Sequence, residues 1–141
     1  MAAALLVGTA TACSDLTGAN ARADGVYYLQ TVNGTSVPYS YIDSQTGNTV
    51  TVQSDVYSLN SDATYSELAT YRVSNGSQTT TQSQTESGTW TQSSSIVTFT
   101  PSLSSTNNFS LYQGSIGNSG SFGGARTLSI TINGTTAIYS E

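Results

Sequence analysis

Apolar and polar side chains alternate along much of this chain with a period of two residues, which is the pattern of a half-buried β-strand. The longest alternating segment covers residues 63–74. One of its faces carries Ala63, Tyr65, Glu67, Ala69, Tyr71 and Val73, and the other carries Thr64, Ser66, Leu68, Thr70, Arg72 and Ser74. No segment shows the period of about 3.6 residues that indicates an amphipathic helix. We therefore predict an all-β fold.

Short turn signals separate the predicted strands. Asn-Gly pairs stand at residues 33–34, 75–76 and 133–134, and both residue types tolerate the positive φ angles of a tight hairpin turn. The chain has room for about eight to ten short strands at the usual spacing between turns. Closure removes the two exposed edges of such a sheet. We predict an antiparallel meander that closes into a small up-and-down β-barrel, with an open β-sandwich as the alternative.

The composition limits the possible functions. With 141 residues, of which 36% are hydrophobic, the chain fits one domain. It has no lysine and no histidine and a net charge of -5, so we expect no nucleic-acid binding. Without histidine there is no Ser-His-Asp triad, and the scattered acids form no calcium-loop pattern. We expect neither an enzyme nor a metal or cofactor site, although a carboxylate pair assembled by the fold stays open.

The N-terminus reads MAAALLVGTATACSD, an apolar and small-residue run that ends at Cys13, the only cysteine. This run has the length of a signal-peptide core and is shorter than the about 20 residues that span a bilayer. Residues 9–13 resemble the signal of bacterial lipoproteins, in which small residues precede a lipidated cysteine. The resemblance implies a signal peptide over residues 1–12 and a lipid on Cys13. The alternative is an ordinary secretory signal with an unpaired cysteine.

The same resemblance implies attachment to the bacterial cell envelope, where Ser14 favours the outer membrane or the cell surface over the inner membrane. Residues 13–23 have no apolar periodicity, so we predict a flexible tether there. The folded domain is predicted over residues 24–141, and we expect it to be a monomer.

Four segments of this domain, residues 25–34, 62–76, 86–100 and 125–140, together resemble small bacterial lipoproteins with lipocalin-like domains. Gly25-Val26-Tyr27 is similar to the Gly-x-Trp opening of lipocalins. Arg126 resembles the late arginine that packs over that aromatic ring. The resemblance implies a calycin-type barrel that binds a small molecule.

Glu67 is the candidate anchor of such a ligand, because it shares a face with Tyr65 and Tyr71 and forms a carboxylate with aromatic neighbours. Alternatively, Glu67 lies in solvent at a barrel end. With Tyr27 and Leu29, the two tyrosines are the candidate lining of a cavity for a small apolar or sugar-like ligand, or simply fill the core. Two functions stay open: a membrane-anchored extracytoplasmic binding module, and a structural or surface-interaction barrel with a filled interior.

Overall fold

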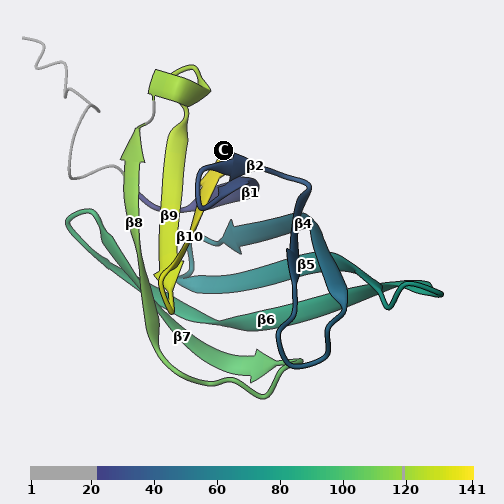
Figure 1. The fold of residues 1–141 in the computed structure, drawn as a ribbon. Helices are drawn as coiled ribbons and strands as arrows, with labels where there is room; N and C mark the ends of the chain where they lie inside the picture. The colour runs from purple at the N-terminus through teal and green to yellow at the C-terminus, as the bar shows by residue number, and fades with distance from the viewer. Residues whose placement is uncertain (1–21, 119) are drawn as a thin grey trace, which may run out of the picture.

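The computed structural model describes residues 22–118 and 120–141, which form an antiparallel β-barrel (Figure 1). The predicted signal peptide, Cys13 and most of the predicted tether lie outside the described residues. The strands are β1 (Gly25–Val32), β2 (Thr35–Ser36), β3 (Tyr39–Ile42), β4 (Thr49–Leu59), β5 (Thr64–Ser74), β6 (Thr79–Ser93), β7 (Ile96–Ser104), β8 (Tyr112–Asn118), β9 (Arg126–Ile132) and β10 (Thr135–Ser140), and a single 3-10 turn, η1, covers Gly120–Phe122. Within this described part of the chain, no helix is long and apolar enough to cross a membrane.

The strands from β3 to β10 pair with their sequence neighbours, as a meander requires. Strand β1 closes the sheet because it pairs with β10 along one edge and with β4 along the other, where Tyr27 lies opposite Tyr57. Eight strands, β1 and β4 to β10, therefore form the closed barrel, and the short strands β2 and β3 extend it at the rim. The predicted meander and its closure are confirmed, and the open sandwich is not formed.

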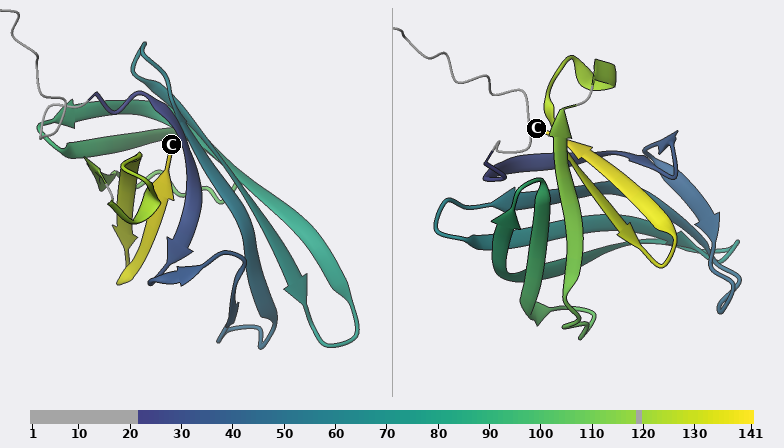
Figure 2. Two further views of the ribbon diagram at one scale, coloured as in Figure 1. Left: turned by 90° about the horizontal axis from the view of Figure 1, so that it is seen from above. Right: turned by 90° about the vertical axis from the view of Figure 1, so that its left-hand side faces the viewer.

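Two of the three Asn-Gly turns adopt the expected conformation, whereas at residues 75–76 only Gly76 has a positive φ angle, of 89°. Asn133 and Gly134, between β9 and β10, have φ angles of 51° and 79°, and Asn33 and Gly34 are close to the same values at 49° and 79°. Both turns lie at one end of the barrel, which we call the open end. The opposite, closed end carries the start of β1, the β4–β5 turn and η1. Figure 2 shows the β5–β6 hairpin reaching past the barrel as a long arm.

The closed end is a packed core. Its largest side chains without solvent contact are Tyr27, Tyr65, Phe99, Leu128 and Val97. Gly88 on β6 allows the strands to approach here, because a Cβ atom at this position would lie 2.1 Å from the carbonyl oxygen of Thr100. The interior of this half is therefore filled by the protein's own side chains.

Ala23 belongs to this core, although the sequence-based prediction places it in the tether. It is fully buried, its N–H donates to Oε1 of Gln92 at 2.9 Å, and its carbonyl oxygen accepts a hydrogen bond from the hydroxyl of Tyr27 at 3.0 Å. One small buried residue ahead of a strand produces no periodic pattern, so the alternation could not indicate it.

Candidate functional site

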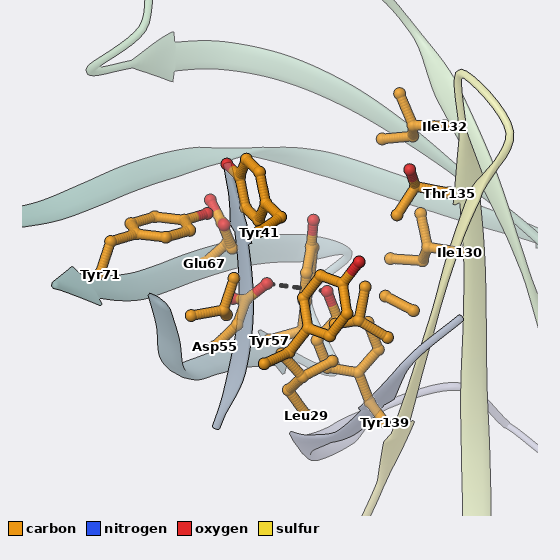
Figure 3. Close-up of a pocket in the computed structure, with 14 residues that line it drawn as sticks. Leu29, Tyr41, Asp55, Tyr57, Glu67, Tyr71, Ile130, Ile132, Thr135 and Tyr139 are labelled. Atoms are coloured by element: carbon orange, nitrogen blue, oxygen red, sulfur yellow. Dashed lines mark hydrogen bonds between the residues drawn. The ribbon is translucent and has the colours of Figure 1, made fainter. Parts of the chain in front are cut away.

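The open half of the barrel contains a cavity of about 540 Å³. It lies between the β9–β10 hairpin and strands β3, β4 and β5 (Figure 3). The lining residues are Leu29, Val32, Tyr39, Tyr41, Val52, Asp55, Tyr57, Glu67, Tyr71, Ile130, Ile132, Thr135, Ala137 and Tyr139. Cavities of roughly 300 to 1,000 Å³ hold small organic ligands in other proteins. The size of this cavity fits that class.

The two sides of the cavity differ in chemistry. Ile130, Ile132 and Ala137 from the β9–β10 hairpin form an apolar side, which Figure 3 shows facing a group of tyrosines and two acids. Among those tyrosines are Tyr41 of β3 and Tyr71 of β5. A ligand in this cavity would contact an apolar surface on one side, and aromatic rings, hydroxyls and carboxyls on the other.

Asp55 is the most buried acid of the cavity, with 8% of its surface exposed. The Tyr139 hydroxyl donates a hydrogen bond of 2.7 Å to its Oδ2 atom. Its Oδ1 atom is buried and has no hydrogen-bond partner among the described residues. Buried polar atoms in folded proteins are nearly always hydrogen-bonded, because an unpaired one keeps its full desolvation penalty. No tyrosine or basic side chain donates to Oδ1, and the side chain besides Tyr139 that shares a hydrogen bond with Asp55 is the neighbouring acid Glu67.

A β-bulge brings Asp55 to the inside of the barrel. The register between β4 and β5 shifts between Val52 and Ser54. Val52 before the bulge and Asp55 after it both line the cavity, although they are three positions apart and such positions point to opposite faces in a regular strand. The alternation in the sequence gives no sign of this shift, so Asp55 was not among the predicted site residues.

Glu67, on β5, lies beside Asp55 of β4 and is only partly exposed. Burial raises its pKa to about 8, and the negative charges of Asp55 and then Glu86 add to the rise. Burial also raises the pKa of Asp55 to about 6, and the hydrogen bond from Tyr139 opposes that rise. Two interacting carboxyls lose their protons in two separate steps. Near neutral pH the two carboxyls therefore share one proton.

Glu86 continues this acidic row on β6, directly opposite Glu67 in the strand pairing. Its Oε1 atom accepts hydrogen bonds from the hydroxyls of Tyr65 at 2.6 Å and Tyr112 at 2.7 Å. It lines a second cavity of about 200 Å³, and Glu67 and Tyr57 are on the walls of both cavities. Glu86 thus has two tyrosine donors, whereas Asp55 has one.

No basic side chain balances these acids. The three basic residues of the chain are Arg22, Arg72 and Arg126, and none lines either cavity. Arg126 binds Glu141 and, at 3.0 Å, the carbonyl oxygen of Asp24 at the closed end. Arg22 pairs with Asp24 at 2.8 Å, and Arg72 is exposed on the outer face of β5. In the described part of the chain, no group of three or more His, Cys, Asp or Glu side chains could hold a metal ion.

The structure distributes the candidate site residues over both halves of the barrel. Leu29, Glu67 and Tyr71 line the cavity, and a role for them in binding stays a prediction. Tyr27 and Tyr65 lie in the packed closed half, where burial raises the pKa of Tyr27 to about 12. They do not line the large cavity.

Arg126 lies near Tyr27, and its positive charge opposes the rise in the pKa of that hydroxyl. Its hydrogen bonds go to Glu141 and to the carbonyl oxygens of Arg22 and Asp24. Arg126 therefore ties the segment before β1 to the C-terminal end of β10. Its role as a cap on the ring stays a prediction.

Tyr139 is a further cavity residue that the sequence-based prediction did not name. It shares the inward parity of Thr135 and Ala137 on β10, so the Asn-Gly turn at 133–134 together with the alternation could have indicated it.

No family model, curated protein or solved structure matches this chain. The fold and the geometry of the cavity alone therefore bear on its function.

Proposed function

We propose that this protein is a small-molecule binding module whose ligand occupies the open half of the barrel. The observation that carries the proposal is the cavity of about 540 Å³ with the unpartnered Oδ1 atom of Asp55 on its wall. A ligand that donates a hydrogen bond to Oδ1 would supply the missing partner. The proposed role is binding without catalysis.

The contrast between the two halves of the barrel supports this proposal over a purely structural role. A barrel of about eight strands is just wide enough either to be filled by side chains or to hold one small molecule. The closed half is filled, as the fully buried Phe99 and Leu128 show. The open half keeps a cavity although large residues such as Ile132 and Tyr41 stand at its mouth, where they are 45% and 43% exposed.

We further propose that the barrel works as a lipoprotein of lipocalin-like type, anchored to the bacterial cell envelope through Cys13. The apolar run before Cys13 and the low charge of the chain support this setting. Cys13→Ala should move the full-length protein from the membrane fraction to the soluble fraction when it is expressed in a bacterium. A mutant that stays in the membrane fraction would contradict the anchor and leave the binding proposal intact.

Binding in the cavity can be tested with N-phenyl-1-naphthylamine, an apolar dye that is neutral at pH 7. We expect its fluorescence to rise on addition of the protein. Ala137→Phe places a ring inside the cavity and should abolish the rise. Ile138→Phe places the same ring on the other face of β10 and is the matched control, because Ile138 does not line the cavity. Both variants should keep the β-sheet signal in circular dichroism.

Equal dye binding by Ala137→Phe and Ile138→Phe would place the dye outside the cavity and contradict the proposal. A folded wild-type protein that binds neither this dye nor any member of a library of small amphiphiles and sugars would favour the structural role.

A further inference from the structure

We infer that the ligand of this cavity is an organic cation, a protonated amine joined to a short apolar or aromatic body. The inference rests on the proposed binding function and specifies the class of ligand. It follows from three features of the cavity: the uncompensated acids, the aromatic rings beside them, and the apolar surface opposite.

The acids form an electrostatic site for a cation. Asp55 and Glu67 line the cavity, Glu86 stands behind Glu67 in the smaller cavity, and no arginine lies in either one. Buried carboxylates in proteins are normally paired with a cation or hydrogen-bonded. Glu86 has its donors in two tyrosines, whereas Oδ1 of Asp55 has none among the described residues. An ammonium group has three donors and no acceptor, which suits an acceptor-only site.

The tyrosines provide a second attraction for the same group. Tyr57 and Tyr139 meet edge to face with ring centroids 5.2 Å apart. Burial raises the hydroxyl pKa of both tyrosines, and the negative charges of Asp55 and Glu67 add to that rise. A cation within about 6 Å of an aromatic ring face is attracted by the ring quadrupole, more strongly when water is excluded. The ammonium would therefore lie between the carboxyls and these rings.

The opposite side of the cavity sets the rest of the ligand. Ile130, Ile132 and Ala137 offer no hydrogen-bonding side chain, and Thr135 adds one hydroxyl near the mouth. This side suits an apolar or aromatic body. The volume of about 540 Å³ limits that body to a small molecule.

Binding of a cation favours loss of the proton that the acid pair shares, because a positive charge beside the carboxyls lowers their pKa values. The titratable groups around Glu67 are Tyr41 on β3, Asp55 and Tyr57 on β4, Tyr65 and Tyr71 on β5, Glu86 on β6, Tyr112 on β8 and Tyr139 on β10. The tyrosines keep their protons at pH 7, since burial raises their pKa values above the ordinary value. The ammonium enters, the acid pair loses its shared proton to solvent, and both carboxylates face the cation.

The test uses three compounds of similar length that share a phenyl ring: 2-phenylethylamine, 2-phenylethanol and 3-phenylpropanoate. At pH 7 they are a cation, a neutral molecule and an anion. We expect the amine to bind at least tenfold more tightly than the alcohol in isothermal titration calorimetry, and the anion not to bind. Titrations in two buffers with different ionisation enthalpies should show release of up to one proton per bound amine.

Glu67→Gln and Asp55→Asn keep the shape of the site, and each removes one of the two carboxylates that would face the bound cation. Either variant should weaken amine binding about tenfold and leave alcohol binding unchanged, and Glu67→Gln should also abolish proton release. Asp62→Asn is the control, because Asp62 is an exposed residue of the β4–β5 turn at the closed end, where it binds Thr64. It removes a carboxylate at the other end of the barrel and should leave amine binding unchanged.

The outcomes separate this inference from the proposed function. If the alcohol displaces N-phenyl-1-naphthylamine from the cavity as well as the amine does, the cavity binds ligands and the inference is wrong. Amine binding that neither Glu67→Gln nor Asp55→Asn weakens would also overturn it. If neither the dye nor any of the three compounds binds, the proposed function and the inference both fail.

Discussion

Replacing Glu67 by glutamine should change how the stability of the barrel depends on pH. In the unfolded chain Glu67 ionises at its ordinary pKa of 4.5, whereas burial in the folded barrel raises the pKa to about 8. The folded state therefore binds more protons between these values. Because of this linkage, the free energy of unfolding falls as pH rises from about 4.5 to about 8.

The size of the effect follows from the same shift. One pKa unit corresponds to about 1.4 kcal/mol, so full ionisation of Glu67 in the barrel would cost on the order of 4 to 5 kcal/mol. Glu67 is only half-buried and solvent screens its charge, so we expect about 2 to 3 kcal/mol. Glu67→Gln has no proton to lose. It should be more stable than the wild type by this amount at pH 9 and nearly equal to it at pH 5.

Urea denaturation followed by the fluorescence of Trp90, the only tryptophan, measures both free energies. Asp62→Asn is again the control. Hydrogen bonds from Thr64 lower the pKa of Asp62, so its ionisation does not change between pH 5 and pH 9, and its effect on stability should be the same at both. If the free energy of unfolding changes with pH in the same way for the wild type and for Glu67→Gln, the raised pKa of Glu67 is contradicted.

Three other substitutions test the packing and the site by urea denaturation. Gly88→Ala should destabilise the barrel by about 2 to 4 kcal/mol, because its Cβ would lie 2.1 Å from the carbonyl oxygen of Thr100; a loss below about 1 kcal/mol would contradict the close approach. Gly134→Val should cost about 1 to 3 kcal/mol through its φ of 79° alone, since a Cβ there contacts nothing within 4 Å. Tyr139→Phe should cost about 1 to 3 kcal/mol at pH 8 and less at pH 5, because it removes the hydroxyl that donates to Oδ2 of the buried Asp55 carboxylate. An unchanged stability at pH 8 would mean that Asp55 is solvated.

The alternation of side chains was enough to predict the strands and the closed meander, because each face of a strand has a period of two. The alternation could not predict how far along the barrel axis each inward side chain lies. Tyr65 and Tyr71 share a face on β5, but six residues of strand separate them by about 20 Å. Tyr65 therefore packs into the closed core, whereas Tyr71 lines the cavity.

The acid pair shows a second limit of the sequence pattern. Glu67 could be named because β5 is regular and its parity is unambiguous. Asp55 could not, because the bulge between Val52 and Ser54 reverses the parity of β4 in mid-strand. A bulge depends on the register of the neighbouring strand, so it is visible only once the strands are paired.

The central claim, that the open half of the barrel is a ligand site, is tested most directly by nuclear magnetic resonance of the labelled methyl groups. During titration with N-phenyl-1-naphthylamine, the methyl signals of Ile130 and Ala137 in the cavity should shift, and those of Val97 and Leu128 in the closed core should stay largely unchanged. Shifts confined to methyl groups on the outside of the barrel, such as those of Leu68 and Leu103, would contradict the claim.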